Sequence, residues 1–86
     1  MQEFTYTIQD SLGIHARPAG MLAKLAKSCA PTIVTLCKGD KSATAGQLMK
    51  VMGMGIKQGD EISVRVEGGS EAEAAATLEN FFHETL

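Results

Sequence analysis

The sequence predicts a small α+β protein in which a four-stranded antiparallel sheet is covered by three helices on one face. The prediction rests on the element order, which reads β-α-β-β-α-β-α along the chain, and on loops short enough for hairpins. It also rests on the length, because 86 residues suffice for one domain with a modest core. We therefore expect one domain that spans residues 1–86.

The first third of the chain predicts one strand and one long helix. Phe4, Tyr6 and Ile8 alternate with polar residues, and a period of two indicates a strand with one buried face. Residues 10–13 are polar and end in a glycine, which is typical of a loop. Residues 16–29 then predict a helix that ends before a proline. Its apolar residues recur at helical spacing: Pro18, Leu22, Leu25, Ala26 and Cys29.

The middle of the chain predicts a hairpin. Residues 32–38 are rich in β-branched types, which favours a strand. Apolar residues occur in both of its alternating sets, so its inward register stays open. Gly39 and Asp40 are typical of a tight turn, and residues 41–44 follow as a short strand.

The last third predicts a short helix, a strand and a final helix. The short helix carries Leu48, Met49, Val51 and Met52 before a glycine-rich exit. Alternation at Ile62, Val64 and Val66 indicates the fourth strand. Ser70 and Glu73 have the spacing of a capping box, so the final helix is expected to begin there. Its predicted buried face consists of Ala74, Ala75, Leu78, Phe81 and Phe82.

Composition and cysteine spacing narrow the classes of function. A net charge of −2 and a small aromatic content disfavour nucleic-acid binding. No apolar stretch is long enough to cross a membrane, and residues 1–10 lack a signal-peptide pattern. We therefore expect a cytoplasmic protein without membrane insertion. Cys29 and Cys37 do not have C-x-x-C spacing, so we expect reduced thiols, at least one of them buried, and no metal site.

The stretch GIHARPAG, residues 13–20, places a histidine at the expected start of the first helix. The first backbone N–H groups of a helix have no internal acceptor and lie at the positive end of its dipole. The backbone that follows His15 is therefore a candidate site for an anion such as phosphate. Pro18 costs little in the first turn, but a residue before proline resists helical geometry, which leaves the conformation of Arg17 open.

This position suits His15 to phosphoryl chemistry. Positive potential favours the neutral ring, whose free nitrogen is a nucleophile. An attached phosphoryl group would draw a proton back onto the ring and make it a better leaving group. Arg17 supplies a planar cation for phosphate oxygens. A solvated helix cap followed by a surface arginine would give the same residues, so the pattern alone leaves both interpretations open.

GIHARPAG and KSATAGQLMKVMGMGIKQGDEISV together resemble the histidine-containing phosphocarrier family, HPr, of the bacterial sugar phosphotransferase system. The resemblance covers nearly the whole chain and implies an open-faced β-sandwich. It implies that His15 accepts a phosphoryl group on Nδ1 from Enzyme I and passes it to enzyme IIA domains. Arg17 and the backbone of Ala16 and Arg17 would steady the phosphate. It also implies a monomeric, stoichiometric carrier without a cofactor rather than an enzyme.

Helical spacing predicts a docking face for acidic partners. Positions three or four apart on the first helix lie opposite the stripe that contains Leu22 and Leu25. These positions are Arg17, Gly20, Met21, Lys24 and Lys27. Leu48, Met49 and Met52 exceed what the short helix can bury, and methionines adapt to several partners. For Val51 and Met54 a place in the core remains equally open.

Two positions depart from the family pattern. Gln47 stands where many relatives carry a regulatory serine, so control by a kinase at that position is not expected. Leu12 stands where relatives often have a small polar residue.

An alternative function is a regulatory or binding module of the same fold, in nitrogen-linked or other signalling, without sugar-transport flux. A ferredoxin-like metal or RNA binder is disfavoured, because the chain lacks C-x-x-C spacing and an aromatic-rich sheet.

Overall fold

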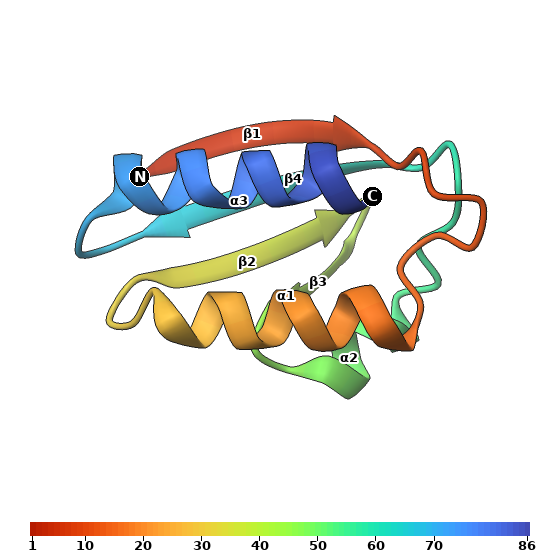
Figure 1. The fold of residues 1–86 in the computed structure, drawn as a ribbon, viewed down its shortest axis with the longest axis horizontal. Coiled ribbons are helices and arrows are strands. Elements are labelled where there is room, and N and C mark those ends of the chain that lie inside the picture. The colour runs from red at the N-terminus through yellow and green to blue at the C-terminus, as the bar shows by residue number, and fades with distance from the viewer.

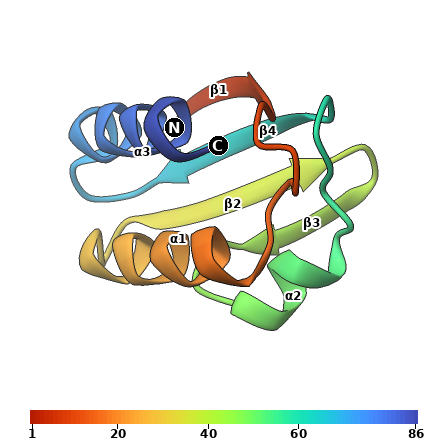
Figure 2. The same cartoon turned by 45° about the vertical axis from the view of Figure 1, so that its right-hand side comes forward.

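The computed structural model describes residues 1–86 and contains the predicted elements in the predicted order. The strands are β1 (Gln2–Thr7), β2 (Ile33–Lys38), β3 (Lys41–Thr44) and β4 (Glu61–Glu67), and the helices are α1 (Ala16–Ser28), α2 (Leu48–Gly53) and α3 (Glu71–Thr85). The strands form one antiparallel sheet in the order β1-β4-β2-β3. Figures 1 and 2 show α1 and α3 side by side on one face of the sheet, with α2 beside α1 and near β3. The predicted fold class is confirmed.

The core lies between the sheet and the helices. Val34 and Leu36 of β2 are buried and pair with Val66 and Val64 of β4, which settles the inward register that the sequence left open. From α3, the ring of Phe82 is fully buried against the aromatic residues of β1. The buried residues form one continuous cluster, to which every helix contributes. This cluster fixes the two ends of α1 relative to the sheet.

Two predicted boundaries are each wrong by one residue. α1 ends at Ser28, and Cys29 is its C-cap. β2 begins at Ile33 rather than at Thr32. Thr32 is buried ahead of the strand, where its Oγ1 donates a hydrogen bond of 2.8 Å to the Gly68 carbonyl. A buried hydroxyl needs such a partner. Thr32 is therefore bonded to Gly68 through its side chain and is not a residue of the β2 strand.

The predicted capping box at the start of α3 does not form. Ser70 is the N-cap, but its side chain makes no capping hydrogen bond. Glu71, rather than Glu73, accepts the Gly68 N–H through Oε2 at 2.6 Å. The pKa of Glu71 lies below its usual range because the Met1 amino group and the Gly68 N–H both donate to its carboxylate. The Gly68–Gly69 turn therefore presents its N–H to the first helical residue instead of the third.

Burial differs from the predictions at a few apolar positions. Both cysteines are free and half-buried, so the expectation of at least one buried thiol is wrong. Leu25, Ala75 and Phe81 are also half-buried rather than part of the fully buried core. Val51 and Met54 are buried in the core, which decides between the two alternatives that the sequence left open for them. None of the three helices combines the length and apolar character that crossing a bilayer requires.

Candidate functional site

His15 lies at the mouth of α1, where it is the N-cap with an extended backbone (φ −101°, ψ −174°). Its side chain does not cap the helix. Its side chain is 37% exposed, so the ring is reachable from solvent. Arg17 is the second residue of α1 and is helical, so the proline that follows it does not exclude helical geometry here.

The first turn of α1 contains backbone donors that are not used within the chain. The N–H groups of Ala16 and Arg17 have no acceptor within the chain, as expected for the start of a helix. No acidic residue lies in this turn. The exposed guanidinium of Arg17 takes part in none of the four ion pairs of the protein. Two amide donors and one unpaired cation thus follow directly after His15 along the chain.

The loop before His15 rests on the connection between α2 and β4. The N–H of the buried residue Ile14 donates to the Ile56 carbonyl at 3.2 Å. Gly13 has a φ of +66°, and a Cβ at that position would lie 2.2 Å from the same carbonyl oxygen. Only a glycine satisfies both conditions without a shift of the backbone. The position of the histidine is therefore tied to that of Ile56.

The α2–β4 connection is itself held by an ion pair. Lys38, the last residue of β2, lies 2.8 Å from Asp60 Oδ2 and also donates to the Gly55 carbonyl at 2.9 Å. The Lys57 N–H donates to the same carboxylate oxygen at 2.8 Å. The Lys38 ammonium, and after it the Lys57 N–H, hold the pKa of Asp60 below its usual range. These contacts close the segment that carries Ile56.

Sequence reasoning missed one residue beside the histidine. Asp10 Oδ2 lies 3.9 Å from His15 Nε2, and Asp10 Oδ1 accepts the Leu12 N–H at 2.8 Å. An aspartate that bonds to the backbone two residues further on is a common turn device. The sequence showed Asp10 in a polar loop, but only the folded loop places it next to the ring. Leu12 itself is exposed and gives the ring no polar partner.

The predicted docking residues lie together on α1 and α2. The two helices are in contact, and the side-chain stem of Lys27 passes close to Gly46, just before α2. Met21 is 46% exposed and Met49 is 78% exposed, which is unusual for large apolar residues. We call the predicted set the α1–α2 face: Arg17, Gly20, Met21, Lys24, Lys27, Leu48, Met49 and Met52. All of these are exposed except Gly20, which is half-buried.

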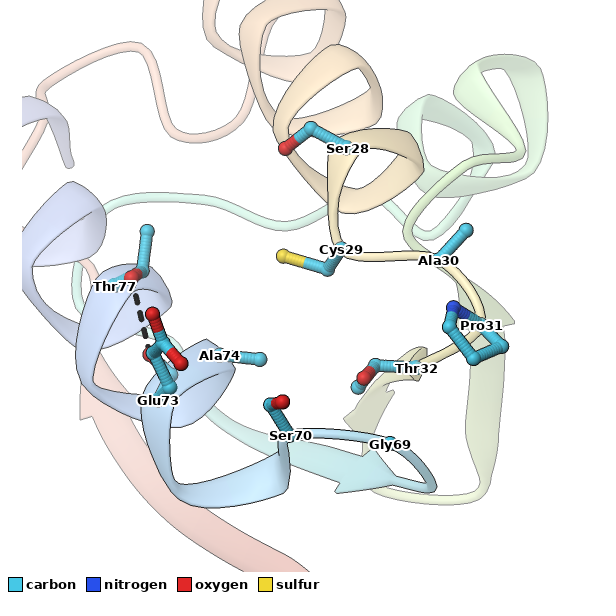
Figure 3. A pocket seen from close by; sticks show the side chains of 10 residues that line it. All are labelled: Ser28, Cys29, Ala30, Pro31, Thr32, Gly69, Ser70, Glu73, Ala74 and Thr77. Atoms are coloured by element: carbon cyan, nitrogen blue, oxygen red, sulfur yellow. Dashed lines mark hydrogen bonds between the residues drawn. The ribbon is translucent and has the colours of Figure 1, made fainter.

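Two hollows of the surface are lined by neither His15 nor Arg17. A shallow one between α1 and α3 is lined by Met21, Lys24, Leu25, Ser28 and Phe81. A cavity of about 380 Å³ lies where the C-terminal end of α1 faces the start of α3. Figure 3 shows Cys29, Thr32 and Ser70 around this cavity. The 13 residues of α1 separate it from His15 by about 20 Å, so it is not part of the histidine site.

The remaining sequence predictions concern Gln47 and metal binding. Gln47 is the exposed N-cap of α2 and makes no side-chain capping bond. No three His, Cys, Asp or Glu side chains are grouped as metal ligands. His83, the other histidine, is exposed on α3, and its ring meets Tyr6 edge-on with 5.0 Å between centroids.

An open-faced α+β fold that presents a histidine beside free amide donors at a helix start defines a class of small phosphoryl-carrying proteins. The family model described as "PTS HPr component phosphorylation site" matches residues 2–84. The chain therefore belongs to the HPr phosphocarrier family, and the resemblance seen in the sequence is confirmed.

Individual relatives agree with this assignment. The chain is 34% identical over 85 residues to the phosphocarrier protein HPr of Mycoplasma capricolum. The aligned region covers 99% of this chain and 94% of the relative. It is 37% identical over 78 residues to that of Lysinibacillus sphaericus, covering 91% and 88%. The solved structure of a mycoplasma histidine-containing phosphocarrier protein superimposes with a TM-score of 0.92 at 32% identity, covering 98% of this chain and 94% of that one.

Proposed function

We propose that this protein carries phosphoryl groups in sugar uptake, taking them from phosphorylated Enzyme I on His15 and giving them to a histidine of enzyme IIA domains. Membership of the family supports the carrier role in a phosphotransferase system. The observation that carries the assignment to His15 is its half-exposed ring at the mouth of α1, next to N–H groups that have no acceptor. His83 lacks such surroundings because it lies within α3.

The transfer is an exchange of one phosphorus–nitrogen bond for another. The lone pair of His15 Nδ1 forms a bond to phosphorus while the bond to the donor histidine breaks, and the electron pair of that bond returns to the donor ring. The proton on His15 Nε2 stays in place. Delivery to the acceptor histidine is the same exchange with His15 as the leaving group. The protein is then regenerated, so it acts as a stoichiometric carrier and not as an enzyme.

The first turn of α1 stabilises the transferred group. The N–H groups of Ala16 and Arg17 are aligned with the positive end of the helix dipole, which favours the negative phosphoryl oxygens. The Arg17 guanidinium, free of any carboxylate, binds these oxygens as a planar donor. Because the helix fixes the two amide donors before the reaction, they need little reorganisation in the transition state.

The α1–α2 face docks both partners in turn. Its cations, Arg17, Lys24 and Lys27, attract acidic surfaces, and its exposed methionines adapt to more than one shape. The face begins at the helix turn that follows His15, so a partner seated on it reaches the ring. Gln47 has no hydroxyl, so regulation by phosphorylation at that position does not belong to the proposal.

A reconstituted relay tests this function. Labelled phosphoenolpyruvate, Enzyme I, this protein and an enzyme IIA domain are mixed, and the label on the IIA domain is followed. We expect label on IIA with the wild-type protein and, to the same extent, with the matched control His83→Ala. We expect none with His15→Ala or when the protein is left out. Label on this protein that never reaches a IIA domain would favour the regulatory alternative, and no label on it at all would refute the carrier role.

A further inference from the structure

One ion pair of the protein involves the His15 ring, and its partner is the carboxylate of Asp10. Asp10 Oδ2 lies 3.9 Å from Nε2, and this is the only one of the four ion pairs that involves a residue of the candidate site. The other ring nitrogen, Nδ1, has no partner within the chain. The two nitrogens of the ring therefore lie in different electrostatic surroundings.

Asp10 is held by hydrogen bonds to its own loop and to Leu86, the C-cap of α3. Its Oδ1 accepts the Leu12 N–H at 2.8 Å, and its backbone carbonyl accepts the Gly13 N–H at 2.9 Å. Its backbone N–H donates to the Leu86 carbonyl at 2.8 Å. These three bonds hold the residue from both sides and leave Oδ2 for the histidine. A side chain held in this way needs little further ordering to act on the ring.

We propose that Asp10 is a positioning residue that keeps the ring proton of His15 on Nε2 and so leaves the lone pair on Nδ1. In a neutral imidazole one nitrogen carries the proton and the other is the nucleophile, and a carboxylate beside one nitrogen favours the proton there. Asp10 also stabilises the protonated Nε2 of the phosphorylated ring, which keeps that ring a good leaving group. The proposal rests on the phosphorylation of His15 proposed above.

At 3.9 Å the contact of Asp10 with His15 is electrostatic and longer than a hydrogen bond. The His15 side chain is 37% exposed and makes no hydrogen bond within the chain, so the ring has room to turn toward the held carboxylate. Hydrogen bonds to reacting groups are often long in the free protein and shorten in the reacting complex. A partner seated on the α1–α2 face would also exclude water and strengthen the interaction.

A purely structural role for Asp10 predicts something different. If the carboxylate only held the turn, any side chain with an acceptor at the same place would replace it. Asn keeps an oxygen for the Leu12 N–H and loses only the negative charge, and Ser offers a weaker acceptor in the same kind of turn. Asp40, exposed in the β2–β3 turn, provides a matched control because Asp40→Asn makes the same change of charge outside the candidate site.

The experiment compares wild type, Asp10→Asn, Asp10→Ser and Asp40→Asn by ¹⁵N NMR of His15 and by the rate of phosphoryl transfer from Enzyme I. We expect both Asp10 variants to move neutral His15 from the Nε2–H toward the Nδ1–H tautomer. We expect kcat to fall about tenfold, with KM unchanged. Asp40→Asn should match wild type in both readouts.

An unchanged tautomer ratio and an unchanged kcat in the folded Asp10→Asn variant would overturn the proposal and leave the carrier function intact. Should wild-type His15 accept no phosphoryl group at all, the carrier function fails. The NMR comparison would still decide whether Asp10 controls the tautomer.

Discussion

The carbonyl oxygen of Ile56 lies where a Cβ on Gly13 would have to be, 2.2 Å from the ideal position of that atom. The same oxygen accepts the Ile14 N–H. The residue before the buried Ile14 and the connection after α2 thus meet without a side chain between them. This contact sets the distance between the histidine loop and the second helix of the α1–α2 face.

Replacing Gly13 by Ala should therefore destabilise the protein. The positive φ and the contact with a backbone oxygen act together, and we expect a loss of about 2 kcal/mol or more in the free energy of unfolding. Urea denaturation measures this loss. Gly20→Ala is the matched control, because a Cβ there meets nothing within 4 Å and Ala favours a helix. Equal stability of Gly13→Ala and wild type would mean that the loop is not held as described.

Arg17 should be replaceable by Lys only in part. Lys keeps the positive charge but loses the planar arrangement of donors that binds two phosphoryl oxygens at once. We expect the rate of phosphoryl transfer to fall about tenfold for Arg17→Lys and about a hundredfold for Arg17→Met. Rapid-quench kinetics with phosphorylated Enzyme I measure both. Lys24→Met, one cation further along α1, should raise KM instead of lowering kcat. Equal rates for Arg17→Met and wild type would remove Arg17 from the site.

Met49 should contribute to docking and not to folding. Its side chain is 78% exposed, so Met49→Asp leaves the core intact but places a negative charge where acidic partners are expected. KM for transfer from Enzyme I should rise about tenfold with the melting temperature nearly unchanged. Ala76→Asp adds the same charge on the exposed side of α3 and serves as the control. If both variants transfer like wild type, the α1–α2 face is not the docking surface.

The Lys38–Asp60 ion pair should make stability depend on pH in the acid range. The pKa of folded Asp60 is lowered, mainly by Lys38, so its contribution is complete above the unfolded value near pH 4 and is lost as the pH falls through the lower folded value. Asp60→Asn should therefore be less stable than wild type at neutral pH, and the difference should shrink on acidification. Urea midpoints at a series of pH values measure it. A difference that grows as the pH falls would contradict the assignment.

Most of the fold follows from local pattern. Apolar residues alternate with polar ones from Phe4 to Tyr6 and again from Ile62 onward. This alternation predicts strands, because one face of each strand is buried against the core. The order β1-β4-β2-β3 was not predictable in the same way, because alternation shows which face is buried and not which strand lies beside it. The capping box failed for a related reason: the turn at Gly68 gives its N–H to Glu71, and sequence spacing does not contain that geometry.

The candidate site was predictable in part. The position of His15 at the start of α1 follows from the helix pattern and the residues around it. The sequence did not predict Asp10 as a site residue, because four loop residues lie between it and His15 and only the hydrogen bonds of the folded loop bring the two side chains together. The methionines divided by burial: Met54 fills the core and Met49 does not, which is decided by how α2 sits against α1 and β3.

The central claim is that a phosphoryl group resides on Nδ1 of His15. The most direct measurement is ³¹P and ¹H–¹⁵N NMR of the ¹⁵N-labelled protein after incubation with Enzyme I and phosphoenolpyruvate. We predict one acid-labile phosphorus coupled to Nδ1 of His15, with the proton on Nε2 and the signals of His83 unchanged. A phosphorus on Nε2, on His83 or on a hydroxyl group would contradict the account.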